Sequence, residues 1–123
     1  MKMPKLLLLA TSAALLGATP AAAVDVATFL TQADRLMRMG PLAFREMRAL
    51  TAQLERSNAT LRAERAAAVR QGRRPAYCPN AANPAAPREI FRALQAVPVA
   101  QRSSTSVTDA LRTFYARRDP CPA

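Results

Sequence analysis

The chain has 123 residues, half of them hydrophobic, and a formal net charge of +10. It contains no histidine, which removes the commonest general base and the commonest metal ligand in proteins. Its positive charge favours an anionic partner. The simpler explanation is the arginine content that a GC-rich genome produces.

Residues 1–23 have the pattern of a cleaved secretory signal peptide. Lys2 and Lys5 give it a positive start, residues 6–17 form an uncharged apolar run, and three alanines precede the expected cleavage point. The alternative is a membrane anchor, but a membrane span needs about 20 apolar residues. We therefore expect a periplasmic mature protein of residues 24–123, with no stable membrane insertion and no nucleic acid as its partner.

The mature chain is predicted to be all-α, a small four-helix domain. Apolar residues recur at helical spacing in four segments, while no segment shows the alternation of a strand. Start and stop signals then set the predicted bounds. The predicted helices span residues 26–39, 42–71, 87–97 and 107–118.

The first predicted helix begins after Asp25, a favourable N-cap, and ends at Gly40. The second begins after Pro41 and ends before Gly72. One face of the first helix is predicted to be buried: Phe29, Leu30, Ala33, Leu36 and Met37. The corresponding stripe of the second is Met47, Leu50, Leu54, Leu61 and Ala68.

Asn58 and Arg65 interrupt the apolar stripe of the second helix. We interpret this as a helix that leaves the core near its C-terminal end, with the Arg65 side chain reaching solvent along an apolar surface. The alternative is a role for these polar residues in binding a partner.

A proline-rich loop over residues 72–87 separates the second and third helices. The third helix should bury Ile90, Phe91, Leu94 and Val97 and stop at Pro98. Ser106 and Asp109 resemble a capping box at the start of the fourth helix.

Cys78 and Cys121 are the chain's two cysteines. An even count in an exported chain predicts a disulfide, because the compartment is oxidising. The alternative is a pair of free thiols. The predicted crosslink would tie the middle of the 72–87 loop to the C-terminus.

Residues that carry catalysis are scarce in the mature chain. Both lysines lie in the predicted signal, so no mature lysine could form a serine–lysine dyad or a Schiff base. Two cysteines without histidine are too few for a structural zinc site, and no glycine-rich phosphate loop is present. We therefore expect a binding protein without a cofactor, and not an enzyme.

Four sequence features together resemble a known family. They are the Gly-Arg-Arg-Pro-Ala-Tyr-Cys-Pro stretch at 72–79, Val-Pro-Val-Ala-Gln-Arg at 97–102, Ser-Val-Thr-Asp-Ala-Leu at 106–111, and the closing Pro120-Cys121 pair. The chain resembles the periplasmic immunity proteins that neutralise amidase effectors of type VI secretion systems, the Rap/Tai immunity family.

The resemblance implies an all-helical periplasmic protein that often forms a homodimer. It implies a protein partner, a peptidoglycan amidase effector whose active-site cleft the immunity protein occludes. The two cysteines correspond to the family's disulfide, whereas the contact residues vary with the effector.

Our candidates for the partner-binding surface are Arg73, Arg74 and Tyr77, since arginine and tyrosine are favoured interface anchors. The alternative is a solvated loop with Tyr77 packed beneath it. An alternative function is a periplasmic envelope-stress or chaperone-like binding protein without a toxin partner, which would bind unfolded clients or anionic lipid.

Overall fold

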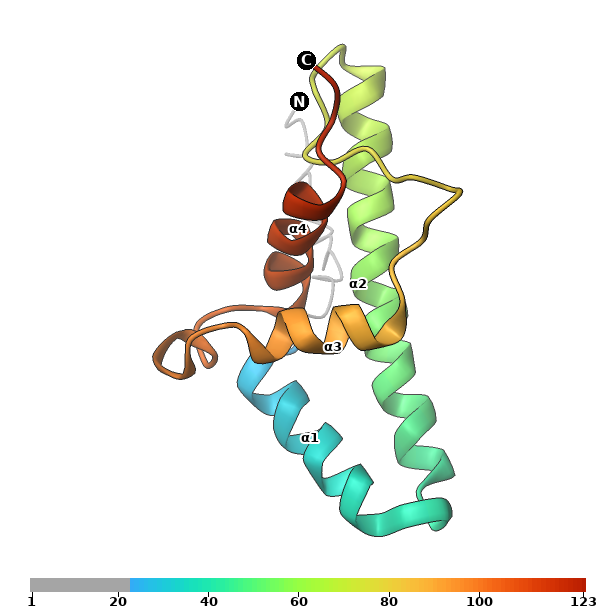
Figure 1. Ribbon diagram of the computed structural model, residues 1–123, viewed down its shortest axis with the longest axis vertical. Coiled ribbons are helices and arrows are strands. Elements are labelled where there is room, and N and C mark those ends of the chain that lie inside the picture. Colours follow the sequence, from blue (N-terminus) through green and yellow to red (C-terminus); the bar gives the residue numbers. More distant parts are fainter. Residues whose placement is uncertain (1–22) are drawn as a thin grey trace, which may run out of the picture.

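The computed structural model describes residues 23–123, which form an all-α domain, as predicted (Figure 1). The predicted signal peptide lies almost entirely outside the described residues. Two short 3-10 helices accompany the four α-helices, and no strand occurs within residues 23–123. In chain order the helices are α1 (Val26–Met39), η1 (Gly40–Leu42), α2 (Phe44–Arg70), α3 (Pro87–Gln95), η2 (Val99–Gln101) and α4 (Val107–Arg118).

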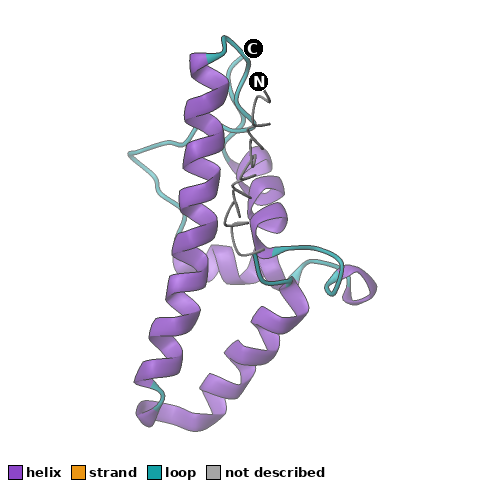
Figure 2. Ribbon diagram, turned by 180° about the vertical axis from the view of Figure 1, so that it is seen from behind, coloured by secondary structure: helices purple, strands orange, loops and turns teal. Residues whose placement is uncertain are grey.

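The longest helix, α2, runs along most of the molecule (Figure 1). Helix α4 packs against its C-terminal half, and α3 crosses in front of α2 and contacts α4, which lies above it in this view. Helix α1 meets α2 at the η1 corner and diverges from it, so that the two helices form a V (Figure 2). The core lies where all four α-helices approach one another.

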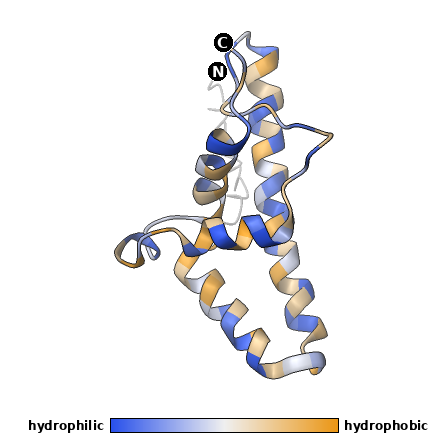
Figure 3. Cartoon of the chain, in the orientation of Figure 1, coloured by the Kyte–Doolittle hydropathy of each residue, from blue (hydrophilic) through white to orange (hydrophobic). Residues whose placement is uncertain are grey.

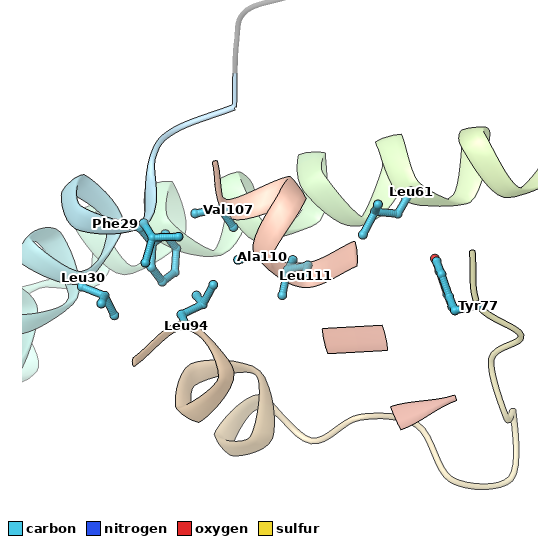
Figure 4. Packing of buried hydrophobic residues seen from close by; sticks show 9 residues of the cluster. Phe29, Leu30, Leu61, Tyr77, Leu94, Val107, Ala110 and Leu111 are labelled. Carbon is cyan, nitrogen blue, oxygen red and sulfur yellow. The ribbon is translucent and has the colours of Figure 1, made fainter. Parts of the chain in front are cut away.

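The core is a single cluster of buried apolar side chains (Figure 4). Its largest fully buried members come from every α-helix: Val26, Phe29, Leu61, Leu94, Val107 and Leu111. Removing such side chains from water is the main favourable contribution to folding. The cluster therefore fixes the relative positions of the four helices.

The starts of α1 and α4 are capped as predicted and joined to each other. Asp25 Oδ1 accepts from the Thr28 N–H at 2.8 Å, and Ser106 Oγ accepts from the Asp109 N–H at 3.0 Å. The Val107 N–H donates to the Val24 carbonyl at 2.8 Å. Val24, near the start of the described residues, is therefore hydrogen-bonded to the helical domain.

Two predicted helix boundaries were wrong by two residues. The second helix begins at Phe44 instead of residue 42, because Gly40, with φ +66°, and Pro41 form the separate turn η1. The third ends at Gln95 instead of residue 97, because the residue before Pro98 is disfavoured in the α conformation.

The interpretation that the second helix leaves the core near its C-terminal end is wrong. Near that end, Leu61 and Ala68 are 1% and 6% exposed, whereas Met47 near the start is 52% exposed. The Arg65 side chain is held against the loop that follows α2, because its Nε donates to the Tyr77 carbonyl at 3.1 Å. The N-terminal part of α2 is the less covered part, because α3 and α4 lie farther along the helix and only α1 lies beside its start.

Met37 of α1 was also predicted to be buried, and it is 65% exposed. It lies near the C-terminal end of α1, where α1 has moved away from the core (Figure 1). Hydrophobic positions nevertheless recur along the whole of α2 (Figure 3). Hydropathy alone therefore does not show which part of these helices is covered.

Candidate partner interface

The predicted disulfide joins Cys78 to Cys121 and closes a long segment of the chain. The S–S distance is 2.07 Å, and neither cysteine is free. Beside it, the Cys78 N–H donates to the Asp119 carbonyl at 2.8 Å. The irregular loop after α2 is thus fastened to the segment that follows α4.

Tyr77 lies beneath this loop and is 7% exposed. Its ring stacks on Tyr115 of α4 with the centroids 5.1 Å apart. The Tyr115 hydroxyl donates to Asn58 Oδ1 of α2 at 3.1 Å. Burial raises the pKa of both tyrosines. In this position Tyr77 supports the loop, which agrees with the alternative interpretation of this residue.

Arg73 and Arg74, the other two candidates, are exposed on the loop. Arg73 donates from Nε and Nη2 to Gln71 Oε1, at 2.8 and 2.6 Å. Arg74 donates to the Cys121 carbonyl. Arg74 is thus held beside the disulfide, whereas Arg73 is held at the C-terminal end of α2.

A hollow of about 420 Å³ lies between the end of α2 and this loop, lined in part by Arg65, Arg73 and Arg74. Glu64 also lines it, but its carboxylate accepts from Arg112 at 2.7 Å. The acid in the hollow is therefore already paired, and the positive charge of the arginines is available. Guanidinium groups bind carboxylates well, so the hollow suits an acidic side chain of a partner.

A second surface is the segment 96–106, which contains η2 and projects from the body of the molecule (Figure 1, orange). Val99, the first residue of η2, is 76% exposed. Inside the segment, Arg102 donates from Nε to the Val97 carbonyl at 2.8 Å and from Nη2 to the Gln95 carbonyl at 2.7 Å. The Thr105 hydroxyl donates to the Gln101 carbonyl at 2.8 Å.

Helix α1 holds the base of this projecting segment. The Ala27 N–H donates to the Arg102 carbonyl at 3.1 Å, and the Val26 N–H donates to the Thr105 carbonyl at 2.9 Å. The segment is therefore preorganised as a convex element. The sequence analysis used residues 97–102 for the family resemblance and did not expect them to bind a partner, although Pro98 and the Ser/Thr-rich run that follows signal a turn between helices.

Arg118 joins α3 to the end of α4 close to the disulfide. Its Nε donates to Glu89 Oε2 at 2.9 Å, and its Nη1 lies 3.0 Å from Asp119 Oδ2. The hydrogen bond from Arg118 is the main reason why the pKa of the Glu89 carboxyl lies below its ordinary value of 4.5.

This contact predicts a dependence of stability on pH. A carboxyl whose pKa is lowered by folding stabilises the folded state above its unfolded pKa, and this stabilisation is lost as the pH falls through the folded value. Glu89→Gln should therefore lower Tm at neutral pH, and its difference from wild type should shrink below about pH 4.5. Thermal melts over a pH series measure this difference.

The control for this series is Glu55→Gln on α2. Glu55 is exposed and forms no ion pair within residues 23–123. Its substitution should leave Tm nearly unchanged at every pH. A Glu89→Gln deficit of the same size at neutral and acid pH would show that the ionised carboxylate is not what stabilises this contact.

Within residues 23–123, no cluster of three or more cysteine, aspartate or glutamate side chains is placed to hold a metal ion. No helix in the same range is long and apolar enough to cross a membrane. The two candidate partner-binding surfaces are the arginine-lined hollow and the projecting segment 96–106.

Comparisons with protein families, with curated protein sequences and with solved structures found no match to this chain.

Proposed function

We propose that this protein is a periplasmic immunity protein, which binds a peptidoglycan amidase effector of a type VI secretion system and occludes its active-site cleft. It acts by binding and carries out no reaction itself. The observation that carries this proposal is the projecting segment 96–106, a convex element held by hydrogen bonds at its base and within it.

Occlusion of a cleft requires a rigid convex element that can enter it. A segment already ordered before binding loses little conformational entropy on association, so more of its contact energy appears as affinity. Val99 is the large exposed apolar side chain of this segment and would be its anchor in the cleft. Its burial against the amidase would exclude water from the nucleophile.

The arginine-lined hollow supports binding of an acidic partner at a different place. Arg73 and Arg74 lie near the C-terminus, on another side of the molecule from the projecting segment (Figure 1). A single cleft would not enclose both surfaces. The hollow would therefore contact a neighbouring part of the effector or a second copy of this chain, and the two surfaces need separate tests.

Val99→Asp is expected to weaken binding of the cognate amidase about 100-fold, the effect of losing a central interface anchor. A candidate amidase with a Cys/His pair, encoded beside this protein, would be expressed in the periplasm with and without it. Survival, pull-down and calorimetry of the pair then measure protection and affinity. Val69→Asp is the matched control, because Val69 is 60% exposed on α2.

The paired variant Arg73→Ala/Arg74→Ala tests the hollow in the same assay. Unchanged affinity for this pair would remove both arginines from the interface and leave the projecting segment. Equal affinity of wild type and Val99→Asp would instead remove the segment. Lysis despite good expression, with no complex formed, would favour an envelope-stress or chaperone-like binding protein without a toxin partner.

A further inference from the structure

Exposed apolar side chains gather at the corner between α1 and α2, which we call the α1–α2 tip (residues 37–48). Of the seven large hydrophobic residues that are exposed within residues 23–123, five belong to it. They are Met37, Met39, Leu42, Phe44 and Met47, with exposures of 65%, 39%, 89%, 74% and 52%. Such a cluster of exposed apolar residues marks an interaction site.

These side chains are not needed to close the corner. Leu36 and Ala43, 6% and 4% exposed, are the residues that the corner buries. Gly40, with φ +66°, and Pro41 make the turn itself. The exposed side chains therefore add nothing to the fold that would explain their apolar character.

The tip is also positively charged. Four arginines, Arg35, Arg38, Arg45 and Arg48, lie in or beside it, against the two acids Asp34 and Glu46. Helix α2 begins at the tip, and its N-cap residue is an alanine without a capping side chain. The first N–H groups of the helix are therefore left to solvent, and their partial positive charge adds to that of the arginines.

We propose that the α1–α2 tip docks this protein peripherally on an anionic phospholipid surface. Leu42 and Phe44, the two most exposed large apolar residues of the tip, would enter the boundary between headgroups and acyl chains. Arg45 and Arg48 would contact the lipid phosphates. Apolar side chains beside arginines are the composition that binds such interfaces.

The shape and charge of the tip favour a membrane over a second copy of this chain. A symmetric dimer places the same patch of both copies face to face, so the four arginines of one copy would oppose those of the other. The tip is also a corner at the end of the molecule instead of a broad face (Figures 1 and 2). Anionic lipid complements both the charge and the apolar side chains.

This docking would leave the candidate partner surfaces free. The tip lies at the end of α2 opposite to the end that carries Arg73, Arg74 and the C-terminus (Figure 1). The projecting segment 96–106 lies between the two ends and points sideways. The inference is therefore independent of the proposed function, and either could hold without the other.

Flotation with phospholipid vesicles tests the inference. The full chain, purified after export, is mixed with vesicles of phosphatidylethanolamine and phosphatidylglycerol, or with vesicles of phosphatidylcholine alone. We expect binding to the anionic vesicles, weakened at high salt by screening of the arginines. Leu42→Ser/Phe44→Ser and Arg45→Gln/Arg48→Gln should each reduce this binding about tenfold or more.

Matched controls remove similar groups elsewhere. Val69→Ser/Val99→Ser loses the other two of the seven large exposed hydrophobic residues within residues 23–123, and Arg62→Gln/Arg70→Gln loses two exposed arginines of α2. Both should bind vesicles as wild type does. All variants carry the same N-terminal residues, so any contribution of these residues to binding cancels in the comparison, and unchanged thermal melts confirm folding.

Two results would overturn the proposal. One is vesicle binding by wild type that the tip variants retain in full. The other is absence of binding to anionic vesicles at low salt. If the tip variants then changed a dimer into a monomer in analytical ultracentrifugation, the occupant of the tip would be a second copy of this chain.

Discussion

Replacing both Cys78 and Cys121 with alanine is expected to lower the free energy of unfolding by about 4 kcal/mol. The two residues are 43 positions apart, so the crosslink removes much of the entropy of the unfolded chain. Outside the disulfide, the loop after α2 is held mainly by the buried Tyr77 and a few hydrogen bonds. Urea unfolding of both proteins, followed by circular dichroism, measures the loss.

The reduced wild-type protein provides the control for this experiment. Reductant should lower its unfolding midpoint to nearly that of the double alanine variant, and it should leave the variant itself unchanged. Since the core cluster draws on all four α-helices, the variant should keep its helical signal in the absence of urea. A wild-type midpoint that does not respond to reductant would show that the crosslink contributes nothing to stability.

Leu111→Ala is expected to lower the free energy of unfolding by about 3 kcal/mol. The Leu111 side chain on α4 is 0% exposed and belongs to the core cluster (Figure 4). Its truncation removes apolar contacts and leaves a cavity that the surrounding helices fill only in part. Urea unfolding with an unchanged m-value would identify the loss as one of stability.

The same substitution at Leu42 is the matched control. Leu42 is 89% exposed at the α1–α2 tip, so Leu42→Ala should change the free energy of unfolding by about 0.5 kcal/mol or less. The two variants differ only in where the leucine lies. Similar losses at both positions would mean that the tip is covered in solution, by a second copy or by another part of the chain.

The local features of this protein were predictable from the sequence. Asp25 and Ser106 set the starts of α1 and α4, because their side chains accept the first N–H groups of each helix. Gly40 ends α1 as expected. The cysteine count and the signs of export predicted the disulfide. Each of these signals acts within a few residues or through a single covalent pair, so one sequence is enough to detect it.

Burial along α2 could be decided only by the tertiary structure. Apolar residues recur at helical spacing at Met47 and at Leu61 alike, yet one is exposed and the other buried. The difference arises because α4 covers the C-terminal half of α2 and does not extend to its N-terminal end. Hydrophobic periodicity predicts which face of a helix would be buried, and not whether another helix reaches that face.

In the candidate partner interface, too, some features were predictable from the sequence and others depended on the tertiary structure. The sequence identified the loop with Arg73 and Arg74, but it did not decide whether Tyr77 is exposed or buried. The Tyr77 ring lies under the loop because Tyr115, 38 positions later, stacks on it. The projection of segment 96–106 likewise depends on hydrogen bonds to α1, at the other end of the described chain. The sequence by itself thus determined that there are four α-helices, the caps of α1 and α4, and the crosslink. Contacts between distant segments decided which side chains remain free for a partner, because only folding brings those segments together.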